Sequence, residues 1–181
     1  MRCCLMFAML LLTAALVRAD VESGPTVGEK VPALKVYAVT GNVDEKELDY
    51  TEERKDRPTV YLLVDRTKFS RPIARFMKTL DDKLSGIVND SYIVGVWLTD
   101  DVGKTKNYLP QAQQSLNFSN TALTLSDGLS GPTGWGVNSS ADLTVVVANK
   151  GKVVAHFGFV SVNETLARQV IEPLKKAVDG Q

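Results

Sequence analysis

Cysteine is almost absent from this sequence. Its only two cysteines, Cys3 and Cys4, lie within the first nineteen residues of the 181-residue chain. Once that segment is removed, the chain has no thiol, so it can form neither a disulfide nor a thiolate nucleophile. The absence therefore excludes thiol chemistry from the mature chain and any stabilisation of its fold by disulfides.

The N-terminal segment has the pattern of a secretory signal peptide. Arg2 supplies a positive start, residues 5–17 are almost entirely apolar, and Ala19 is a suitable small residue before a cleavage site. The apolar stretch is shorter than the roughly 20 residues that a membrane span needs, although an uncleaved anchor is the alternative interpretation. We expect a signal peptide over residues 1–19, cleavage before Asp20, and a secreted or periplasmic protein.

An excess of charge of one sign is also lacking. Without Arg2 and Arg18, the chain has 19 basic and 21 acidic residues, a net charge of about −2. Binding to nucleic acid or to an anionic membrane requires a basic face, which this balance does not favour. No second apolar span, internal repeat or low-complexity tract follows the first segment. The sequence therefore predicts no nucleic-acid partner and no stable membrane insertion.

The mature length of about 160 residues fits a single domain with one core. We expect residues 20–26 to form a short flexible leader and residues 27–181 to form the domain. The charged stretch 52–57 is interpreted as a solvated loop. The glycine-rich stretch 128–136 leads into a strand rather than a helix, so turns explain its glycines better than a phosphate loop does.

Apolar runs predict the strands of one central sheet. Residues 58–65 and 91–99 are apolar almost throughout, as expected of strands that are covered on both faces. Residues 33–39 alternate apolar and polar side chains and lead through Gly41-Asn42 into a hairpin. Further strands are expected at 122–125, 143–148 and 152–157, of which the last two form a C-terminal hairpin.

Helical spacing of apolar residues predicts three helices. The clearest covers residues 73–87, and a weaker one covers 102–116, where Pro110 is expected to break or restart it. A closing helix is expected from Asn163, as its N-cap, to Val178. Strands that alternate with helices predict the α/β class, with a central mixed sheet flanked by helices and a C-terminal hairpin plus helix.

This order of elements resembles the thioredoxin-like fold in its redoxin, or peroxiredoxin-like, form, the type of alkyl hydroperoxide reductases and thiol-specific antioxidant proteins. The resemblance covers the chain from Val27. Residues 27–34 resemble the Gly-x-x-x-Pro stretch that leads redoxin domains into their first strand. Residues 61–65 resemble the strand that precedes the reactive cysteine, which in this family often belongs to a Cys-x-x-Cys motif containing a proline.

The residues that depart from the family pattern are at the positions that carry its chemistry, the two cysteines and the cis-proline. The stretch Phe69-Ser70-Arg71-Pro72-Ile73 keeps the aromatic residue and the proline but has serine and isoleucine where the two cysteines would stand. The strand that normally opens with a cis-proline opens with leucine. A serine hydroxyl neither ionises near neutral pH nor forms a disulfide, so the resemblance implies the fold without its redox activity. The degenerate active-site positions are Ser70, Arg71, Pro72, Ile73 and Leu143.

Ser70 itself has two interpretations. As an N-cap, its hydroxyl would accept a hydrogen bond from a free backbone N–H of the helix. As a nucleophile, it would need a base within hydrogen-bond reach. The single histidine, His156, is expected on the C-terminal hairpin, away from the helix start and partly exposed. We therefore favour the cap and predict no catalytic residue.

Several cations surround the start of the same helix, whose free N–H groups and dipole attract anions. They could hold a carboxylate, a phosphate or a sulfated group where a thiolate would otherwise sit, with Trp135 and Leu143 as an apolar wall. A solvated surface with ordinary ion pairs is the alternative, and Trp135 would then be part of the core. The residues of this candidate anion site are Arg66, Lys68, Ser70, Arg71, Arg75 and Trp135.

Two functions stay open. The favoured one is an exported, non-catalytic binding or scaffolding domain, whose partner is an unknown protein or a small anionic ligand. The other is a redoxin-type thiol oxidoreductase or antioxidant protein that acts with a partner's thiol, since one fold hosts many functions. No metal ligand set and no cofactor are indicated. Asparagine at 89, 117, 138 and 163 fits the N-glycosylation pattern, which matters only in a eukaryotic source.

Overall fold

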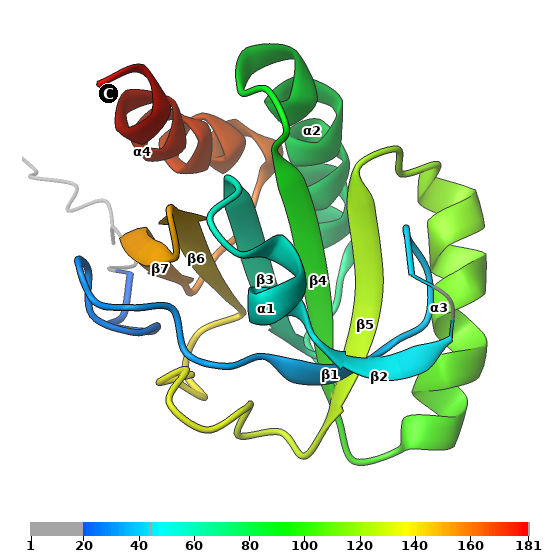
Figure 1. Ribbon diagram of the computed structural model, residues 1–181. Coiled ribbons are helices and arrows are strands. Elements are labelled where there is room, and N and C mark those ends of the chain that lie inside the picture. The colour runs from blue at the N-terminus through cyan, green and yellow to red at the C-terminus, as the bar shows by residue number, and fades with distance from the viewer. Residues whose placement is uncertain (1–19, 44, 181) are drawn as a thin grey trace, which may run out of the picture.

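A seven-stranded mixed sheet forms the centre of the molecule (Figure 1). The computed structural model describes residues 20–43 and 45–180. The strands lie in the order β2-β1-β5-β4-β3-β6-β7, with β3, β4 and β5 parallel and the outer pairs antiparallel. They are β1 (Lys35–Ala38), β2 (Lys46–Asp49), β3 (Thr59–Asp65), β4 (Tyr92–Thr99), β5 (Thr121–Asp127), β6 (Leu143–Asn149) and β7 (Lys152–Phe159).

The strands β3 and β4 lie inside the sheet because their side chains are suited to burial on both faces. Every residue of β4 is buried, and so is every residue of β3 except Asp65. The two strands pair in parallel from Thr59 opposite Tyr92 to Asp65 opposite Leu98. Parallel strands covered on both faces are built from such apolar runs. The predicted fold class and the two central strands are therefore confirmed.

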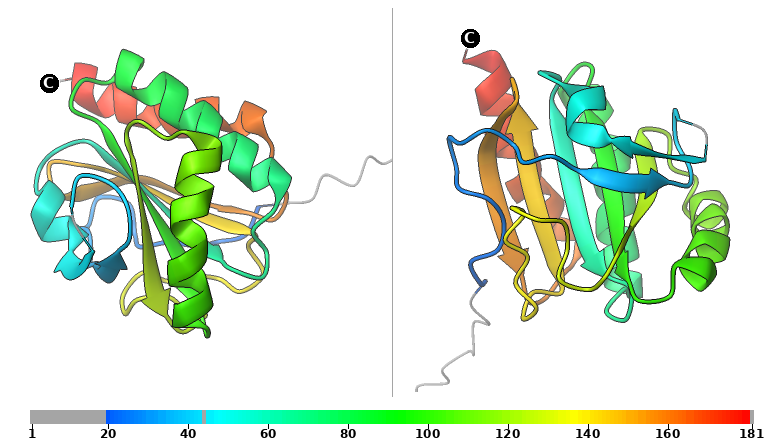
Figure 2. Two further views of the ribbon diagram at one scale, coloured as in Figure 1. Left: turned by 90° about the vertical axis from the view of Figure 1, so that its right-hand side faces the viewer. Right: turned by 60° about the horizontal axis from the view of Figure 1, so that its bottom comes forward.

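Three longer helices cover one face of the sheet: α2 (Arg71–Ile87), α3 (Val102–Leu116) and α4 (Ala167–Asp179). Figure 2 (left) shows α2 and α4 lying together on this face, with α3 beside the other end of the sheet. The apolar side of α2 packs into the larger core through Ile73, Phe76 and Leu80. Burial of this stripe stabilises the helix more than intrinsic propensity does.

The other face of the sheet is covered by less regular structure. The short helix α1 (Tyr50–Arg54), the segment 31–38 and the loop before β6 pack there around a second core (Figure 1). This core contains Tyr50, Tyr61 and Trp135, all almost completely buried. Each face of the sheet thus has its own apolar core.

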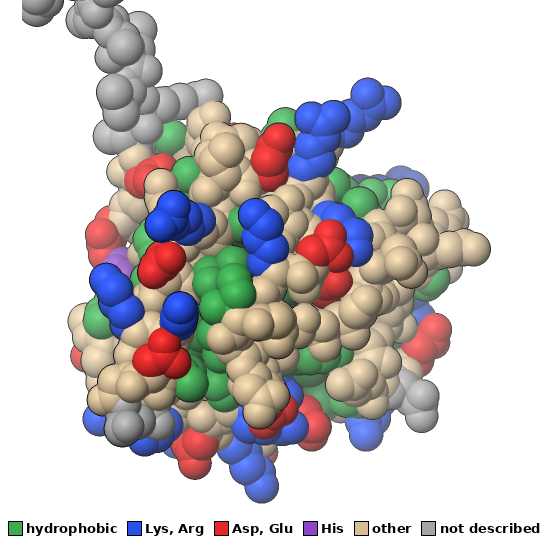
Figure 3. All heavy atoms as spheres, turned by 90° about the horizontal axis from the view of Figure 1, so that it is seen from above, with side chains coloured by type: hydrophobic (Ala, Val, Ile, Leu, Met, Phe, Trp, Pro, Cys, Tyr) green, Lys and Arg blue, Asp and Glu red, His purple; other side chains and the backbone are tan. Residues whose placement is uncertain are grey.

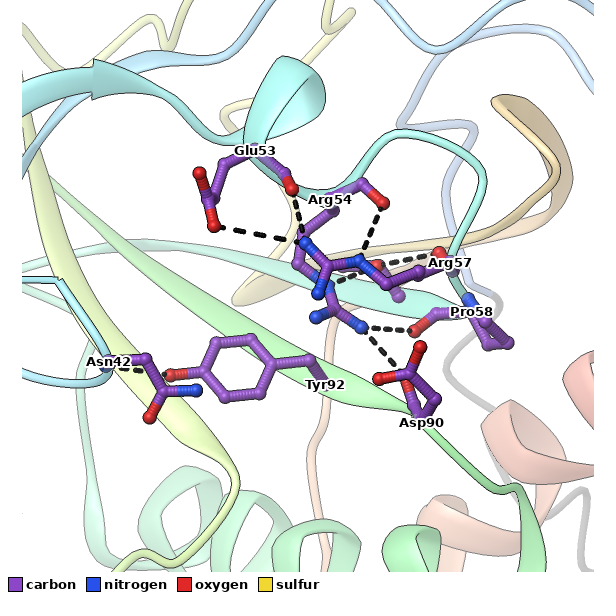
Figure 4. A network of polar contacts seen from close by, with 8 residues as sticks. Asn42, Glu53, Arg54, Arg57, Pro58, Asp90 and Tyr92 are labelled. Carbon is purple, nitrogen blue, oxygen red and sulfur yellow. Dashed lines mark hydrogen bonds and ion pairs between the residues drawn. The ribbon is translucent and has the colours of Figure 1, made fainter.

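The prediction of a solvated loop over residues 52–57 was wrong, because the stretch begins within α1 and contains a buried arginine. The Arg54 guanidinium donates to Thr59 Oγ1 at 3.1 Å and to the carbonyls of Pro58 at 3.3 Å and Asp90 at 2.7 Å (Figure 4). It also lies 5.0 Å from the centre of the Tyr92 ring. These acceptors replace water, although burial still lowers the pKa of Arg54.

Pro110 does not interrupt α3, contrary to expectation. The helix runs continuously from Val102 to Leu116, with Asp101 as its N-cap. A proline removes one backbone hydrogen bond, but Pro110 is exposed, so the carbonyl that loses its partner can face water. Buried Leu109 and Ala112 hold the two halves of the helix against the sheet.

Three further elements differ in detail from the prediction. The strand expected at 122–125 is longer, because β5 continues alongside β4 to Asp127. The C-terminal hairpin is confirmed, and β7 extends to Phe159. Asn163 does act as a cap, since its Oδ1 accepts from the Thr165 backbone N–H at 2.9 Å, but the first turn is a 3₁₀ turn, η1 (Glu164–Leu166).

The segment expected to be a flexible leader lies against the sheet. The Val21 backbone N–H donates to the Gly158 carbonyl at 2.9 Å, and Ser23 is buried. Figure 2 (right) shows this segment running beside β7. The backbone hydrogen bond of Val21 and the burial of Ser23 therefore hold residues 21–24 against the sheet edge. The composition of the segment alone had suggested mobility.

The surface charge is mixed. The face seen from above in Figure 3 shows Lys and Arg side chains interspersed with Asp and Glu. Such a face produces no strong field of one sign. Within residues 20–43 and 45–180, no helix has the length and apolar character to cross a membrane.

Candidate functional site

The site begins where β3 ends and α2 starts. Ser70 occupies the N-cap position of α2 with an extended backbone (φ −142°, ψ 167°), and its carbonyl accepts from the Ala74 N–H at 2.9 Å. Its hydroxyl, however, makes no capping hydrogen bond. Pro72 follows at the second helical position and has no N–H, so one of the two donors that an N-cap side chain normally uses is missing. The prediction that Ser70 occupies the N-cap position is confirmed, whereas the predicted hydrogen bond from a backbone N–H to its hydroxyl is not formed.

The other two positions at which the family carries its chemistry belong to the core. Ile73 and Leu143 are each 1% exposed and lie in the larger apolar core. Leu143 pairs with Phe159 across the C-terminal hairpin, and no described peptide bond is cis. The side chains at these two positions pack in the core, so a reactive group placed there would be closed off from solvent.

His156 provides no base for Ser70. It lies on β7, which β6 separates from β3. Its Nδ1 is 3.1 Å from the Ser23 carbonyl oxygen, and its Nε2 is 3.3 Å from Glu22 Oε1. Because this is the only histidine, a serine–histidine pair is excluded. His156 is therefore engaged with the N-terminal segment and not with Ser70.

The four cations expected around the helix start point in different directions. Lys68 Nζ donates to the carbonyls of Ser139 and, at 2.8 Å, Ala141, which ties the β3–α2 connection to the loop before β6. Arg66 lines a separate pocket, while Arg71 and Arg75 line a groove over α2. Only these two of the four thus share one surface.

The ion pairs of the alternative interpretation are not formed by the three arginines. None of Arg66, Arg71 and Arg75 makes an ion pair within 4.0 Å of any residue that the structure describes. Asp81, which lies on the same helix as Arg71 and Arg75, is buried and accepts hydrogen bonds from the backbone N–H groups of Ser119 and Asn120. The three arginines are therefore not neutralised by an ion pair with a described residue.

Trp135 does not belong to this site. It is completely buried in the second core, where it contacts Tyr61 edge-on at 5.1 Å between ring centres. Its Nε1 donates to the Ala33 carbonyl at 3.0 Å. The loop before β6 does face the β3–α2 connection, as the Lys68 contacts show, but this side chain turns to the opposite face of the sheet. The alternative interpretation, burial as packing, is the correct one.

A groove separates the N-terminal half of α2 from α3. It consists of two pockets of 520 and 400 Å³ that share Arg71, Ala74 and Leu116. Lining residues contributed by only one of the pockets are Phe69, Ser70, Tyr108, Gln111, Ala112, Ser115, Arg75, Lys78, Thr79 and Glu164. Volumes of this size suit a small molecule. Its charges are three cations and one carboxylate, so it can bind an anion.

The sequence did not identify the α3 side of this groove. Tyr108, Gln111 and Ser115 recur at helical spacing and so share one side of α3. That spacing was readable, but nothing local indicates that this side faces α2. Only the packing of both helices on the same sheet brings them together.

Residues 20–43 and 45–180 contain no cluster of three His, Asp or Glu side chains that could hold a metal ion.

Comparison with known proteins identifies the fold. No family model and no curated protein sequence matches this chain. A DsbF homologue from Corynebacterium diphtheriae is 16% identical, with 93% of this chain and 96% of that one covered and a TM-score of 0.61. A peroxiredoxin-like protein from Aquifex aeolicus is 16% identical over 85% and 91% of the two chains, with a TM-score of 0.56. A secreted thiol-disulfide isomerase from Corynebacterium glutamicum is 12% identical over 80% and 84%, with a TM-score of 0.53. The chain therefore has the thioredoxin-like fold in which redoxins and thiol-disulfide isomerases are built.

Proposed function

We propose that this chain is an exported, non-catalytic binding domain that holds an anionic ligand in the groove between α2 and α3. The observation that carries the proposal is that Arg71 and Arg75 form no ion pair with a described residue and line a groove large enough for a small molecule. The thioredoxin-like frame is retained, while the positions of its redox chemistry are occupied by Ser70 and Ile73. The former active face then serves as a binding surface.

The charges at the start of α2 favour an anionic ligand. Arg71, Arg75 and Lys78 all lie in its N-terminal half, and its first turn has no acidic residue. Positive charges at a helix N-terminus oppose the helix dipole, and like charges four residues apart repel one another, each by some tenths of a kcal/mol. Lys78 is neutralised by Asp82 at 2.6 Å, but the two arginines are not. An anion in the groove relieves both unfavourable terms.

The groove also limits which anions fit. Glu164 lines the pocket that contains Arg75 and Lys78, so a ligand there meets one carboxylate. The pocket next to Ser70 has Arg71 as its only charged lining residue, together with Tyr108, Gln111 and Ser115 as polar groups. We place the anionic group beside Arg71, where no carboxylate lines the pocket and hydrogen-bond donors are available.

A thermal-shift titration tests this proposal. Phosphate, sulfate and acetate are added to protein beginning at Asp20 and to its Arg71→Glu variant. A ligand present at ten times its Kd should raise the native Tm by about 3 °C, and the shift should shrink with added salt because exposed charges are screened over about 8 Å. Arg71→Glu should respond to none of them.

Lys83→Glu is the matched control for that titration. Lys83 lies on the same helix, is exposed, and is twelve residues away, or about 18 Å along the helix axis. Its variant should respond as the native protein does. Equal shifts in native protein and Arg71→Glu, or no shift with any anion, would refute an anion site in this groove.

Two assays test the non-catalytic function, with dithiothreitol supplying the thiol that a redoxin-type oxidoreductase of this kind would take from a partner. Protein beginning at Asp20 should neither reduce insulin disulfides with dithiothreitol nor consume hydrogen peroxide above the buffer rate, because it contains no thiol. Clear turnover in either assay would refute the non-catalytic function.

Export rests on the signal-peptide pattern, which lies outside the described residues. N-terminal sequencing of the protein from its native host should give Asp20 as the first residue. An intact Met1 on cytoplasmic material would contradict export.

A further inference from the structure

Trp97 is a buried hydrogen-bond donor without a partner. It lies near the end of β4, is 0% exposed, and its Nε1 has no acceptor among the described residues. The second tryptophan, Trp135, shows the usual situation, with Nε1 donating to the Ala33 carbonyl. Because burying an unpaired donor is unfavourable, such a group in a native structure requires an explanation.

The orientation of the Trp97 indole directs this donor toward the end of β4 that adjoins the candidate site. A Cβ built on Gly95 would lie 3.1 Å from Trp97 Cζ3, so the six-membered ring points back along the strand. Nε1 sits at the diagonally opposite end of the indole. It therefore faces the side where the β3–α2 connection crosses, and there the Phe69 ring lies 5.0 Å from the indole.

A pocket of 340 Å³ lies at this place, lined by Arg66, Phe69, Trp97 and Tyr108. Phe69 and Tyr108 also line the groove next to Ser70, so the two cavities meet at these rings, whose centres are 6.3 Å apart. The Arg66 backbone is held by a hydrogen bond from its N–H to the Leu98 carbonyl at 3.0 Å. The pocket thus combines one cation, one unpaired N–H and two aromatic rings.

The charge on Arg66 is available to a ligand. Its guanidinium forms no ion pair within 4.0 Å of a described residue. The pKa of Asp101 is lowered mainly by hydrogen bonds from Lys104, and the charge of Arg66 is the smallest of the causes. Lys104 already neutralises that carboxylate at 2.8 Å.

We propose that this pocket binds an aromatic carboxylate. The carboxylate pairs with Arg66 and accepts the Trp97 Nε1–H, while the ring of the ligand packs against Phe69 and Tyr108. A single cation with a single donor matches a monoanion, and aromatic walls favour a flat apolar body. The inference goes beyond the proposed function, because it assigns a second anionic ligand to a pocket that meets the groove at Phe69 and Tyr108.

Binding requires a side chain to move. Nε1 is closed off from solvent, so a carboxylate reaches it only when a side chain that lines the pocket, such as Tyr108, turns aside. Tyr108 is 38% exposed, and no hydrogen bond fixes its hydroxyl to a described residue. Exposed side chains change rotamer on the nanosecond scale, so this opening does not need a change of fold.

NMR of the two indole N–H groups tests the proposal. Benzoate is titrated into ¹⁵N-labelled protein beginning at Asp20, and Trp135→Phe or Trp97→Phe assigns the two peaks, since either variant leaves one. Benzoate should shift the Trp97 peak downfield and leave the Trp135 peak in place. Benzamide, which lacks the charge, and cyclohexanecarboxylate, which lacks the aromatic ring, should each bind at least tenfold more weakly.

The variant Arg66→Gln should weaken benzoate binding at least tenfold, whereas Lys83→Gln should not change it. The inference is overturned if the Trp97 peak does not move, or if it moves equally in Arg66→Gln. If it is overturned while Arg71→Glu still abolishes the response to inorganic anions, the proposed function stands without this ligand class. If neither effect is seen, both proposals are wrong.

Discussion

The hydroxyls of Ser23 and Thr144 are hydrogen-bonded, with 2.6 Å between their oxygens, although 121 residues separate them in the sequence. Both side chains are almost completely buried. Ser23 Oγ also accepts from the Asn138 N–H at 2.9 Å. One hydroxyl thus joins the N-terminal segment to β6 and to the loop before it.

Removing this hydroxyl should destabilise the protein. Ser23→Ala leaves Thr144 and the Asn138 N–H without their partner, so we expect the free energy of unfolding to fall by about 1–3 kcal/mol. Urea denaturation measures the change, with the exposed Ser140→Ala as control. A double-mutant cycle with Thr144→Val should show coupling of at least about 0.5 kcal/mol. Additive effects would contradict the hydroxyl pair.

Gly158 makes room for the same segment. A Cβ at this position would lie 2.1 Å from the Val21 carbonyl oxygen, so Gly158→Ala should push residues 21–24 off β7. Hydrogen exchange of the Val21 N–H, which is bonded to Gly158, should then accelerate by at least tenfold. Gly86→Ala on α2 meets no atom within 4 Å and should be neutral or stabilising by up to about 1 kcal/mol. Unchanged exchange in Gly158→Ala would show that the segment is not held there.

The sequence predicted those elements whose pattern reflects burial directly. The apolar runs of β3 and β4 and the helical stripe of α2 follow from which faces are covered, so their residue types reveal them. Buried Arg54 could not be predicted, because its acceptors include the Asp90 carbonyl, 36 residues away. Only the assembled fold brings that carbonyl into reach.

The candidate site was predictable only where local sequence defines it. Ser70 and Arg71 follow directly from the strand–helix junction, which local sequence defines. The sequence left two placements open for Trp135, because a loop residue can turn to either face of the sheet. Its indole N–H finds an acceptor on the far side, at Ala33, so burial as packing is the correct one. Trp97 gave no signal, since an unpaired indole N–H is visible only in three dimensions.

Asp81 should contribute strongly to stability. It is 1% exposed on α2 and accepts hydrogen bonds from the Ser119 and Asn120 N–H groups and from the Thr121 hydroxyl. Asp81→Ala leaves all three donors unpaired beneath the helix, so a loss of about 3 kcal/mol is expected in urea denaturation.

The neighbouring residue provides a matched control. Asp82 is exposed and pairs with Lys78 on the surface, an interaction worth about 0–1 kcal/mol. Asp82→Ala should therefore lower the stability by less than about 1 kcal/mol. Equal effects of the two substitutions would contradict the role assigned to Asp81.

Stability should fall at alkaline pH because tyrosines are buried around the second core. Burial raises the pKa of Tyr61 from 10.0 to about 12, and burial also raises those of Tyr50 and Tyr92. The folded state then holds protons that the unfolded state releases above pH 10, so the free energy of unfolding decreases between about pH 10 and 12.

For Tyr61 alone, this decrease amounts to about 2–3 kcal/mol. Tyr61→Phe cannot ionise, so its stability, measured by urea denaturation from pH 8 to 11.5, should fall less steeply than that of the native protein. Parallel pH profiles would show that Tyr61 does not couple ionisation to folding.

Ser70→Cys tests whether the helix start still has the electrostatics of the fold's reactive position. Protein beginning at Asp20 has no other thiol, so the variant reports on this site alone. The N-terminus of α2 and the adjacent Arg71 stabilise a thiolate, which should lower the thiol pKa by about one unit from its ordinary value near 8.5. The control is Ser85→Cys, because Ser85 is exposed near the other end of the same helix and lacks this stabilisation.

The rate of alkylation by iodoacetamide, measured against pH, gives the thiol pKa of both variants. Coinciding midpoints would mean that the helix start holds no usable positive potential, and the anion site proposed beside Arg71 would lose its physical basis.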